Sequence, residues 1–242
     1  MNTARSIREI TDGWASLATT VPTEVKNTAA SYSIAPQWST GTILAYFIQT
    51  MQCVDWPKEI RDKLIQFNWH RDILEKIAAY AAKDIEAMQK LNINPQKGLL
   101  LMGPVGCGKT EIILMLKKFI KSGIKEEYVY DIMMNCSEKG EKALSPYRFG
   151  PIFSQSGKPI DCLFDDLGVD PPITHFGRKI IVGQELIYIR HLFFKKTGAK
   201  SHFTTNLNVE ELTEYYKNIS RSRLREMCNV IQFPKDAPDL RH

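Results

Sequence analysis

The chain has 242 residues, of which 43% are hydrophobic and 24% charged, a composition typical of a globular protein and not of a disordered or fibrous one. Its formal net charge of +5 is compatible with a nucleic-acid partner, but it is far too small to indicate one by itself. The five cysteines are scattered without a C-x-x-C pair, so neither a zinc site nor a disulfide framework is expected, and a reducing cytoplasmic location is predicted.

The beginning of the chain differs from the rest. Residues 1–40 are rich in Ser, Thr and Ala and lack a sustained apolar period, so they are expected to be only partly ordered. Residues 40–51 are apolar and predict a helix, and Asp55-Trp-Pro-Lys-Glu59 predicts the start of another. We expect residues 1–60 to form a small, mostly helical, partly flexible partner-binding region, separate from a core at 61–242. No segment resembles a signal peptide or a membrane span of ~18 apolar residues, so no membrane partner is expected.

From residue 72 onward, regular elements are predicted throughout. Apolar residues at helical spacing predict one helix over 72–91, which Asn94-Pro95 ends. After it, strands are predicted at 99–102, 128–134, 160–164 and 200–204, and helices at 111–120, 179–194 and 209–216. Asn208 and Glu211 form a capping-box pattern at the start of the last helix. This alternation predicts an α/β fold in which a parallel sheet is flanked by helices on both faces.

A complete phosphate-binding motif lies between the first strand and its helix. The sequence Gly103-Pro-Val-Gly-Cys-Gly-Lys-Thr110 matches G-x-x-x-x-G-K-[ST], whose glycines let amide groups point at phosphate oxygens. Lys109 is expected to reach the β- and γ-phosphates, and Thr110 to place its hydroxyl on Mg²⁺. The predicted nucleotide-binding residues of this segment are Gly103, Pro104, Val105, Gly106, Cys107, Gly108, Lys109, Thr110 and Glu111. ATP and Mg²⁺ are the predicted cofactors.

Two aspartates end the strand predicted at 160–164. Buried carboxylates are costly unless they meet a cation or water, and a phosphate-loop site supplies the cation. Asp165 is predicted to hold Mg²⁺ together with Thr110, and Asp166 to act as the general base on water. The alternative is an acidic turn without a catalytic role.

Polar residues also follow the strand predicted at 200–204. Asn206 is expected to face the same crevice as the phosphate loop and to contact phosphate or the attacking water, although Thr205 and Asn206 could simply form a turn. Further along, Arg221, Arg223 and Arg225 are spaced so that they cannot all lie on one helical stripe. Arg223 is the candidate for a catalytic arginine acting on a neighbouring subunit.

Taken in this order, the motifs resemble the AAA+ family of P-loop ATPases. GPVGCGKT resembles its Walker A motif, LFDDLG its Walker B motif, FTTNL its first sensor and SRSRL its arginine-finger box. Within the family, DDLG, TTNL and the final Asp239-Leu240-Arg241 are similar to the DnaC/IstB group, the bacterial replicative helicase loaders and transposition helpers. The resemblance covers about residues 65–242 and implies a reduced or absent helical lid, with Arg241 as a second-sensor arginine on the nucleotide.

The resemblance also implies an activity and partners. It implies an ATPase in DNA replication that assembles head to tail as a homo-oligomer, engages single-stranded DNA and contacts a replicative helicase. A transposition helper that contacts a transposase is the alternative, and so is an ATP-dependent assembly switch without hydrolysis. Asp166 stands where glutamate is commoner, which leaves slow hydrolysis open. A small-molecule kinase is a third class, disfavoured by the paired aspartates and Asn206.

A basic and aromatic loop is predicted at residues 135–158. Charged side chains beside aromatic rings suit single-stranded DNA, because the charges contact the backbone and the rings stack on bases. An ordinary surface loop is the alternative. The residues concerned are Lys139, Lys142, Arg148 and Lys158, with Tyr147, Phe149 and Phe153 between them.

Overall fold

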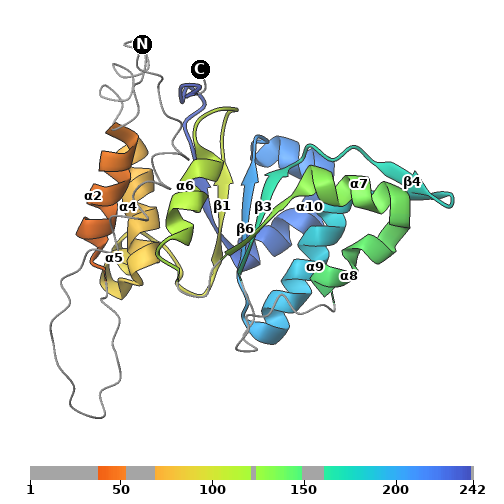
Figure 1. The fold of residues 1–242 in the computed structure, drawn as a ribbon, viewed down its shortest axis with the longest axis horizontal. Helices are drawn as coiled ribbons and strands as arrows, with labels where there is room; N and C mark the ends of the chain where they lie inside the picture. Colours follow the sequence, from red (N-terminus) through yellow and green to blue (C-terminus); the bar gives the residue numbers. More distant parts are fainter. Residues whose placement is uncertain (1–37, 53–68, 121–123, 149–160, 241–242) are drawn as a thin grey trace, which may run out of the picture. The chain divides into compact units, whose positions relative to one another are not determined.

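The computed structural model describes residues 38–52, 69–120, 124–148 and 161–240, and Figure 1 shows their fold. By its internal contacts the chain divides into two compact units, Met1–Leu91 and Asn92–His242, and each is described by itself. The predicted boundary at residue 60 lies outside the described residues and stays a prediction. The same holds for the predicted character of residues 1–37 and for the helix start at 55–59.

The described part of the first unit is helical. It contains α2 (Thr40–Gln52), as predicted, α4 (Trp69–Ala82) and α5 (Ile85–Lys90). The single helix predicted over 72–91 is wrong, because the chain breaks at Lys83, where φ is +55°. Asp84 then caps α5 by accepting from the amide of Ala87 at 3.0 Å, and its other oxygen accepts from Thr40 Oγ1 at 2.7 Å.

The second unit contains the predicted parallel sheet. Its described strands are β1 (Gly98–Met102), β2 (Ile124–Tyr128), β3 (Asp161–Leu167), β6 (Ser201–Thr205) and β7 (Cys228–Gln232). They pair in the order β2-β3-β6-β1-β7, and every pair is parallel. Because β6 lies between β1 and β3, the carboxyl ends of these three strands meet at one edge. The strand β7 was not predicted from the sequence.

Helices cover the sheet. They are α6 (Lys109–Lys117), α7 (Val129–Lys139), α9 (Val182–Thr197) and α10 (Val209–Met227), with the short η1 (Gly140–Leu144) and α8 (Ser145–Arg148) after α7. A buried cluster joins α7, α9 and α10 to Leu100 and Met102 of β1, Phe203 of β6 and Phe164 of β3. Figure 1 shows α6 on the other side of β1, where alternate strand residues point. The α/β fold predicted from the sequence is confirmed.

The helix predicted at 209–216 begins as predicted but extends to Met227, and two further predicted elements of the second unit differ from the structure. The strand predicted at 128–134 is wrong, since β2 ends at Tyr128 and α7 follows. The buried residues Val129, Ile132, Met133 and Cys136 recur at i, i+3, i+4 and i+7, which is the period of a helix face. The helix predicted from 179 begins at Val182 instead.

A small hairpin accounts for that second difference. The antiparallel strands β4 (Ile173–His175) and β5 (Arg178–Ile180) are joined by Phe176 and Gly177, both with positive φ, as a two-residue hairpin turn requires. In Figure 1 the hairpin projects past α7, away from the sheet. None of the described helices is long and apolar enough to span a membrane.

Candidate nucleotide-binding site

The loop between β1 and α6 has a backbone that favours glycine. Gly106 and Gly108 have φ values of +79° and +88°, in the left-handed region where a side chain is strained. Gly108 is also the N-cap of α6, so the unpaired amide groups of the first helical turn lie at this loop. A glycine-rich loop followed by the positive end of a helix fits the binding of phosphate groups.

The Lys109 ammonium group lies inside this loop. The residue is 5% exposed, and Nζ donates to the carbonyls of Gly103 (3.0 Å) and Pro104 (2.8 Å). It also donates to Oδ1 of Asn206, at the end of β6, at 2.8 Å. Burial lowers the pKa of Lys109, and the acidic groups nearby offset part of that effect. The lysine predicted to bind phosphate is thus already positioned between the loop and the neighbouring strand.

Asp165, in β3, is joined to the loop through Thr110. Thr110 Oγ1 donates to Oδ1 of Asp165 at 2.8 Å, and Thr204 Oγ1 in β6 donates to the same oxygen. Asp165 is 4% exposed, so burial raises the pKa of its carboxyl group, while the two hydroxyl hydrogen bonds counteract the rise. The two residues predicted to hold Mg²⁺ therefore lie side by side and offer the oxygen ligands that this ion prefers.

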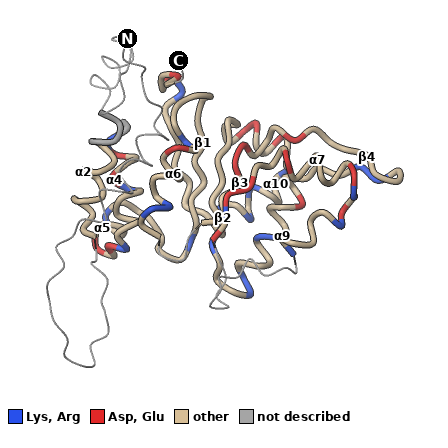
Figure 2. Tube along the Cα trace, viewed as in Figure 1, with Lys and Arg blue, Asp and Glu red and all other residues tan. Residues whose placement is uncertain are grey.

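Asp166 lies at an irregularity in its strand. Its φ is +58°, and the pairing of β3 with β6 shifts register between Phe164 and Leu167, which marks a β-bulge. The Asp166 amide donates to Thr204 Oγ1 at 3.0 Å, and Asn206 Nδ2 donates to Asp166 Oδ1 at 3.3 Å. A bulge redirects a side chain, and here the Asp166 carboxylate stays beside Asp165 and Asn206 instead of alternating to the other face. Figure 2 shows acidic positions gathered beside β3.

Asn206 connects the two halves of the site. Its amide group accepts from Lys109 through oxygen and donates to Asp166 through nitrogen, so three predicted residues form one hydrogen-bonded chain. This contact depends on the position of β6 between β1 and β3. The assembly of loop, lysine, hydroxyl and paired aspartates on a parallel sheet decides the fold type. The chain has a P-loop NTPase core.

The chain is similar to two solved proteins, while no family model matches it. The solved DnaC helicase loader is 19% identical with a TM-score of 0.44, covering 65% of this chain and 90% of that one. DnaI is 16% identical with a TM-score of 0.45, covering 65% of this chain and 85% of that one.

A curated protein matches a shorter part of the chain. The putative pachytene checkpoint protein 2 of Caenorhabditis elegans is 23% identical over 126 residues, which are 52% of this chain. The match spans 28% of that relative's length.

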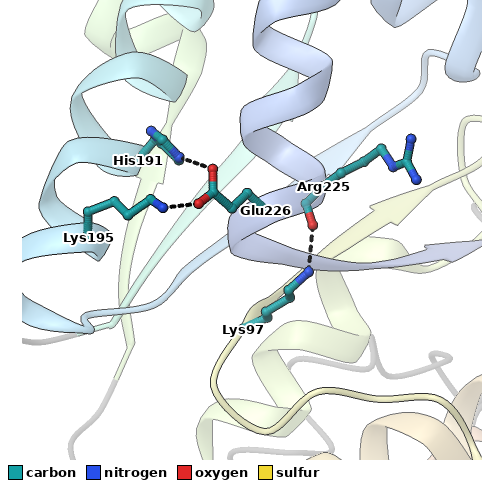
Figure 3. Close-up of polar contacts among 5 residues, drawn as sticks. All are labelled: Lys97, His191, Lys195, Arg225 and Glu226. Atoms are coloured by element: carbon teal, nitrogen blue, oxygen red, sulfur yellow. Dashed lines mark hydrogen bonds and ion pairs between the residues drawn. The ribbon is translucent and has the colours of Figure 1, made fainter.

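The P-loop NTPase core does not bring every predicted residue to the nucleotide site. Arg223 lies near the end of α10, and its guanidinium group is 4.5 Å from the ring centre of Tyr188 in α9. The helix leads into Cys228, which pairs with Gly98 at the amino end of β1, whereas the phosphate loop follows the carboxyl end. Lys97 Nζ also donates to the Arg225 carbonyl at 2.7 Å (Figure 3). Arg223 is therefore remote from its own phosphate loop.

Three further predictions have separate outcomes. Arg241 lies outside the described residues. The loop predicted at 135–158 is wrong as far as residue 148, because α7, η1 and α8 occupy it, and the remainder lies outside the described residues. Tyr147 is 7% exposed, donates to Glu127 at 3.0 Å and packs edge-on against Phe164. Its ring is thus part of the core and not a platform for bases.

Besides β7, two features were not predicted from the sequence. Thr204 binds both Asp165 and the Asp166 amide, and the polar TTN sequence at the end of β6 was a signal for it. The second feature is the β4–β5 hairpin, whose tip residue Phe176 is 98% exposed. A glycine between two short alternating segments was the available signal for this turn.

Proposed function

We propose that this chain binds ATP and Mg²⁺ at the phosphate loop, hydrolyses the nucleotide, and acts in DNA replication as a helicase-loader-like factor in the cytoplasm. One observation carries the proposal. Lys109, Asn206 and Asp166 form a continuous hydrogen-bonded chain beside the Thr110–Asp165 pair. A structural turn would need none of these side-chain contacts, whereas phosphoryl transfer needs each of these groups close together.

Each group has a distinct task in this proposal. The amides from Gly106 to Thr110 and the start of α6 bind the phosphates, and Lys109 moves from the loop carbonyls to the β- and γ-oxygens. Thr110 and Asp165 hold Mg²⁺, which neutralises charge on the phosphates when bound. Burial raises the pKa of Asp165 because it disfavours the charged carboxylate. A cation bound beside this carboxylate would offset that cost, so the buried position favours cation binding.

Asp166 and Asn206 serve the water molecule. The bulge holds the Asp166 carboxylate at the carboxyl end of the sheet, where it accepts the proton of the attacking water as general base. Asn206 keeps that carboxylate oriented through Nδ2 and contacts Lys109 through Oδ1. The short side chain of Asp166 reaches the water only if Asn206 holds its carboxylate and Thr204 holds its backbone amide in place. This requirement makes turnover slow.

Arg223 acts on another subunit. The end of α10 lies toward the amino ends of the strands, so the arginine cannot serve the phosphate loop of its own chain. Stacking on Tyr188 keeps the guanidinium group extended and ordered. A head-to-tail homo-oligomer would place Arg223 against the phosphates of the neighbouring site, where it stabilises transferring charge.

The hairpin supports a contact with single-stranded DNA. Phe176 offers an exposed ring at its tip, and exposed Arg178 and Lys179 follow in β5. Figure 2 shows basic positions at this hairpin. Rings that stack on bases and cations that contact phosphates are what single strands require. Arg178 also pairs with Glu141, which ties the turn end of the hairpin to η1.

The test measures nucleotide affinity and turnover of the full chain with and without single-stranded DNA. We expect magnesium-dependent ATP binding, DNA-stimulated hydrolysis, and loss of both for Lys109→Ala. A matched control is Lys97→Ala, which removes a lysine at the opposite end of the sheet and should leave both unchanged. Failure to bind adenine nucleotides would overturn the proposal, and turnover that requires a small-molecule acceptor would favour a kinase.

A second experiment tests the oligomer. Arg223→Ala and Lys109→Ala subunits are each expected to be inactive, but their mixture should regain part of the activity, because one supplies the intact arginine and the other the intact loop. A mixture as inactive as its parts would contradict action across an interface.

Two alternatives share this core. A transposition helper would bind a transposase where a loader binds a replicative helicase, and capture with the full chain and a chain lacking residues 1–60 separates them. An assembly switch would bind ATP and oligomerise without measurable turnover.

A further inference from the structure

The segment that follows Asp166 is a tight turn with a buried carboxylate at its end. The Val169 amide donates to the Asp166 carbonyl at 3.4 Å, and Gly168 has a φ of +104°, which favours glycine. Asp170 comes next and is fully buried. Burying a carboxylate is costly unless its oxygens accept hydrogen bonds, so the partners of Asp170 indicate what holds the turn in place.

Both carboxylate oxygens of Asp170 have partners on other elements. Oδ2 accepts from the Gly183 amide in α9 at 2.7 Å, and Oδ1 accepts from the Tyr216 hydroxyl in α10. The Tyr215 hydroxyl donates to the Asp170 carbonyl at 2.7 Å. Burial raises the pKa of Asp170, and the hydrogen bonds from Tyr216 and Gly183 oppose that rise. The end of the turn is thus bound to two helices at once.

The contact with Gly183 gives α9 a cap that its own sequence lacks. Ile181 precedes the helix, and its side chain cannot accept a hydrogen bond from the first turn. The Asp170 carboxylate accepts instead from an amide of that turn, where the helix dipole also favours a negative charge. An ideal Cβ on Gly183 would overlap with the hydroxyl of Tyr216, so a glycine is needed for the helix and the tyrosine to approach.

The tyrosine side of this network is held against a backbone cost. Lys217, which follows the buried Tyr216 inside α10, has a φ of +66° and a ψ of 163°. Residues other than glycine rarely adopt this conformation, and it persists only where the surrounding contacts fix the chain. The hydrogen bonds of Tyr215 and Tyr216 to Asp170 provide such contacts directly before the strained residue.

The other end of the turn carries the proposed general base. Asn206 Nδ2 donates to Asp166 Oδ1 at 3.3 Å, which is longer than most hydrogen bonds of this kind. A hydrogen bond of this length fixes the direction of a carboxylate only in part. That direction therefore also depends on the backbone of the turn, in which Asp166 itself has a φ of +58°.

Resting on the proposed hydrolysis, we propose that Asp170 is a positioning residue for Asp166. By binding α9 and α10 through separate oxygens, it fixes the end of the turn relative to two helices that cover the sheet. The turn then keeps one conformation, which directs the Asp166 carboxylate at the attacking water. Asp170 is buried and acts only through the turn.

The first test compares two buried tyrosines in the full-length protein. Tyr216→Phe removes the hydroxyl that binds Asp170 and keeps the ring, so we expect kcat for ATP hydrolysis to fall by about ten- to a hundredfold, as for a misplaced catalytic group. KM for ATP should change by less than about twofold, because the phosphate loop is unaltered. Tyr147→Phe is the matched control, since it removes a hydroxyl that donates to Glu127 at 3.0 Å, and it should leave both constants unchanged.

A second test determines whether the effect passes through Asp166. Tyr216→Phe should cause no further loss of turnover when it is combined with Asp166→Asn, because the base is already absent. Asp170→Asn retains an oxygen for the Gly183 amide and an amide group that can donate to the Tyr216 hydroxyl. It should therefore keep more activity than Asp170→Ala. Single-turnover phosphate release measures the slow variants.

Each outcome decides between the proposals. A selective loss of kcat in Tyr216→Phe that is absent in the Asp166→Asn background supports the inference. An unchanged kcat, an equal loss in Tyr147→Phe, or a full further loss in the Asp166→Asn background overturns it. Failure of the unaltered chain to bind or hydrolyse ATP overturns the proposed function, and the inference with it.

Discussion

The two ends of the parallel strands use polar side chains in different ways. At the carboxyl ends, buried and half-buried side chains bind one another, as Lys109 does with Asn206 and Thr110 with Asp165. At the amino ends, polar side chains mostly bind the backbone. Asn229 donates to the carbonyls of Asn94 and Gly98, at 2.9 and 3.1 Å.

The ion pairs of the amino-end region lie at the surface. Glu226 in α10 accepts from His191 at 2.7 Å and pairs with Lys195 in α9 (Figure 3). These contacts tie two helices together without enclosing a ligand. The difference teaches that the bonds from Asn229 to backbone carbonyls hold the fold. A buried lysine that binds both loop carbonyls and a side chain, beside paired aspartates, forms instead a candidate site for chemistry.

The largest expected effect separates two aspartates of one strand. Asp166→Asn should lower turnover by about 1,000-fold with ATP affinity retained, because an amide cannot accept the proton of water. Asp161→Asn is the control at the amino end of β3, where Oδ1 accepts from the Lys200 amide at 2.9 Å, and it should leave turnover unchanged. Steady-state phosphate release measures both. Equal losses would show that the two ends do not differ as described.

A pair of asparagines sharpens the same comparison. Asn206→Ala should reduce turnover by about 100-fold, since it removes a donor and acceptor between Lys109 and Asp166. Asn208→Ala removes the N-cap of α10 and should cost about 1 kcal/mol of unfolding free energy without changing turnover. Turnover assays and urea unfolding measure the two effects. Unchanged turnover of Asn206→Ala would mean that Asn206 only helps to form the turn after β6.

A third prediction concerns a buried histidine in the central strand β6. Burial, with help from the positive Lys200 and Arg190, lowers the pKa of His202 from 6.5 to about 3. Below pH 6.5 the imidazole of His202 is protonated in the unfolded chain but stays neutral in the folded one, so the free energy of unfolding falls as the pH drops toward 3. Between pH 7 and 4.5 this amounts to about 3 kcal/mol. Unfolding of His202→Gln should lack this pH-dependent component, and an identical pH profile for both proteins would refute the assignment.

The smallest effect is expected at the surface cluster. The Lys195 and His191 hydrogen bonds lower the pKa of Glu226, but all three side chains are accessible to water. Because exposed ion pairs contribute little, Glu226→Gln should change neither the thermal midpoint nor turnover measurably. A marked loss of activity would mean that the end of α10 contributes to the site through this cluster.

Local sequence patterns were sufficient for much of the fold. The motif from Gly103 to Thr110 predicted a glycine-rich loop between a strand and a helix, and the structure has that loop between β1 and α6, with positive φ at Gly106 and Gly108. Asn208 and Glu211 identified the start of α10 through a capping box that the structure contains. Each of these features is settled within a few residues of chain.

Other predictions were wrong because the pattern was judged over too short a span. Residues 128–134 suggested a strand, although the apolar period over Val129–Cys136 is helical. The residues at 135–148 suggested a loop because charged residues are frequent there, but one helical face packs Tyr147 against β3. The hairpin at Ile173–Ile180 is too short for periodicity to reveal.

The sequence by itself predicted which residues would bind phosphate and metal, because that chemistry depends on residue type and local spacing. Only the tertiary structure decided which of them meet. Asn206 reaches Lys109 and Asp166 because β6 pairs between β1 and β3, and Asp170 reaches Tyr216 because α10 packs in one buried cluster with β3. Arg223 is remote from its own phosphate loop because α10 leads into β7 at the amino ends of the strands, whereas the loop follows the carboxyl end of β1. Strand order and register depend on contacts between distant segments, which no local pattern contains.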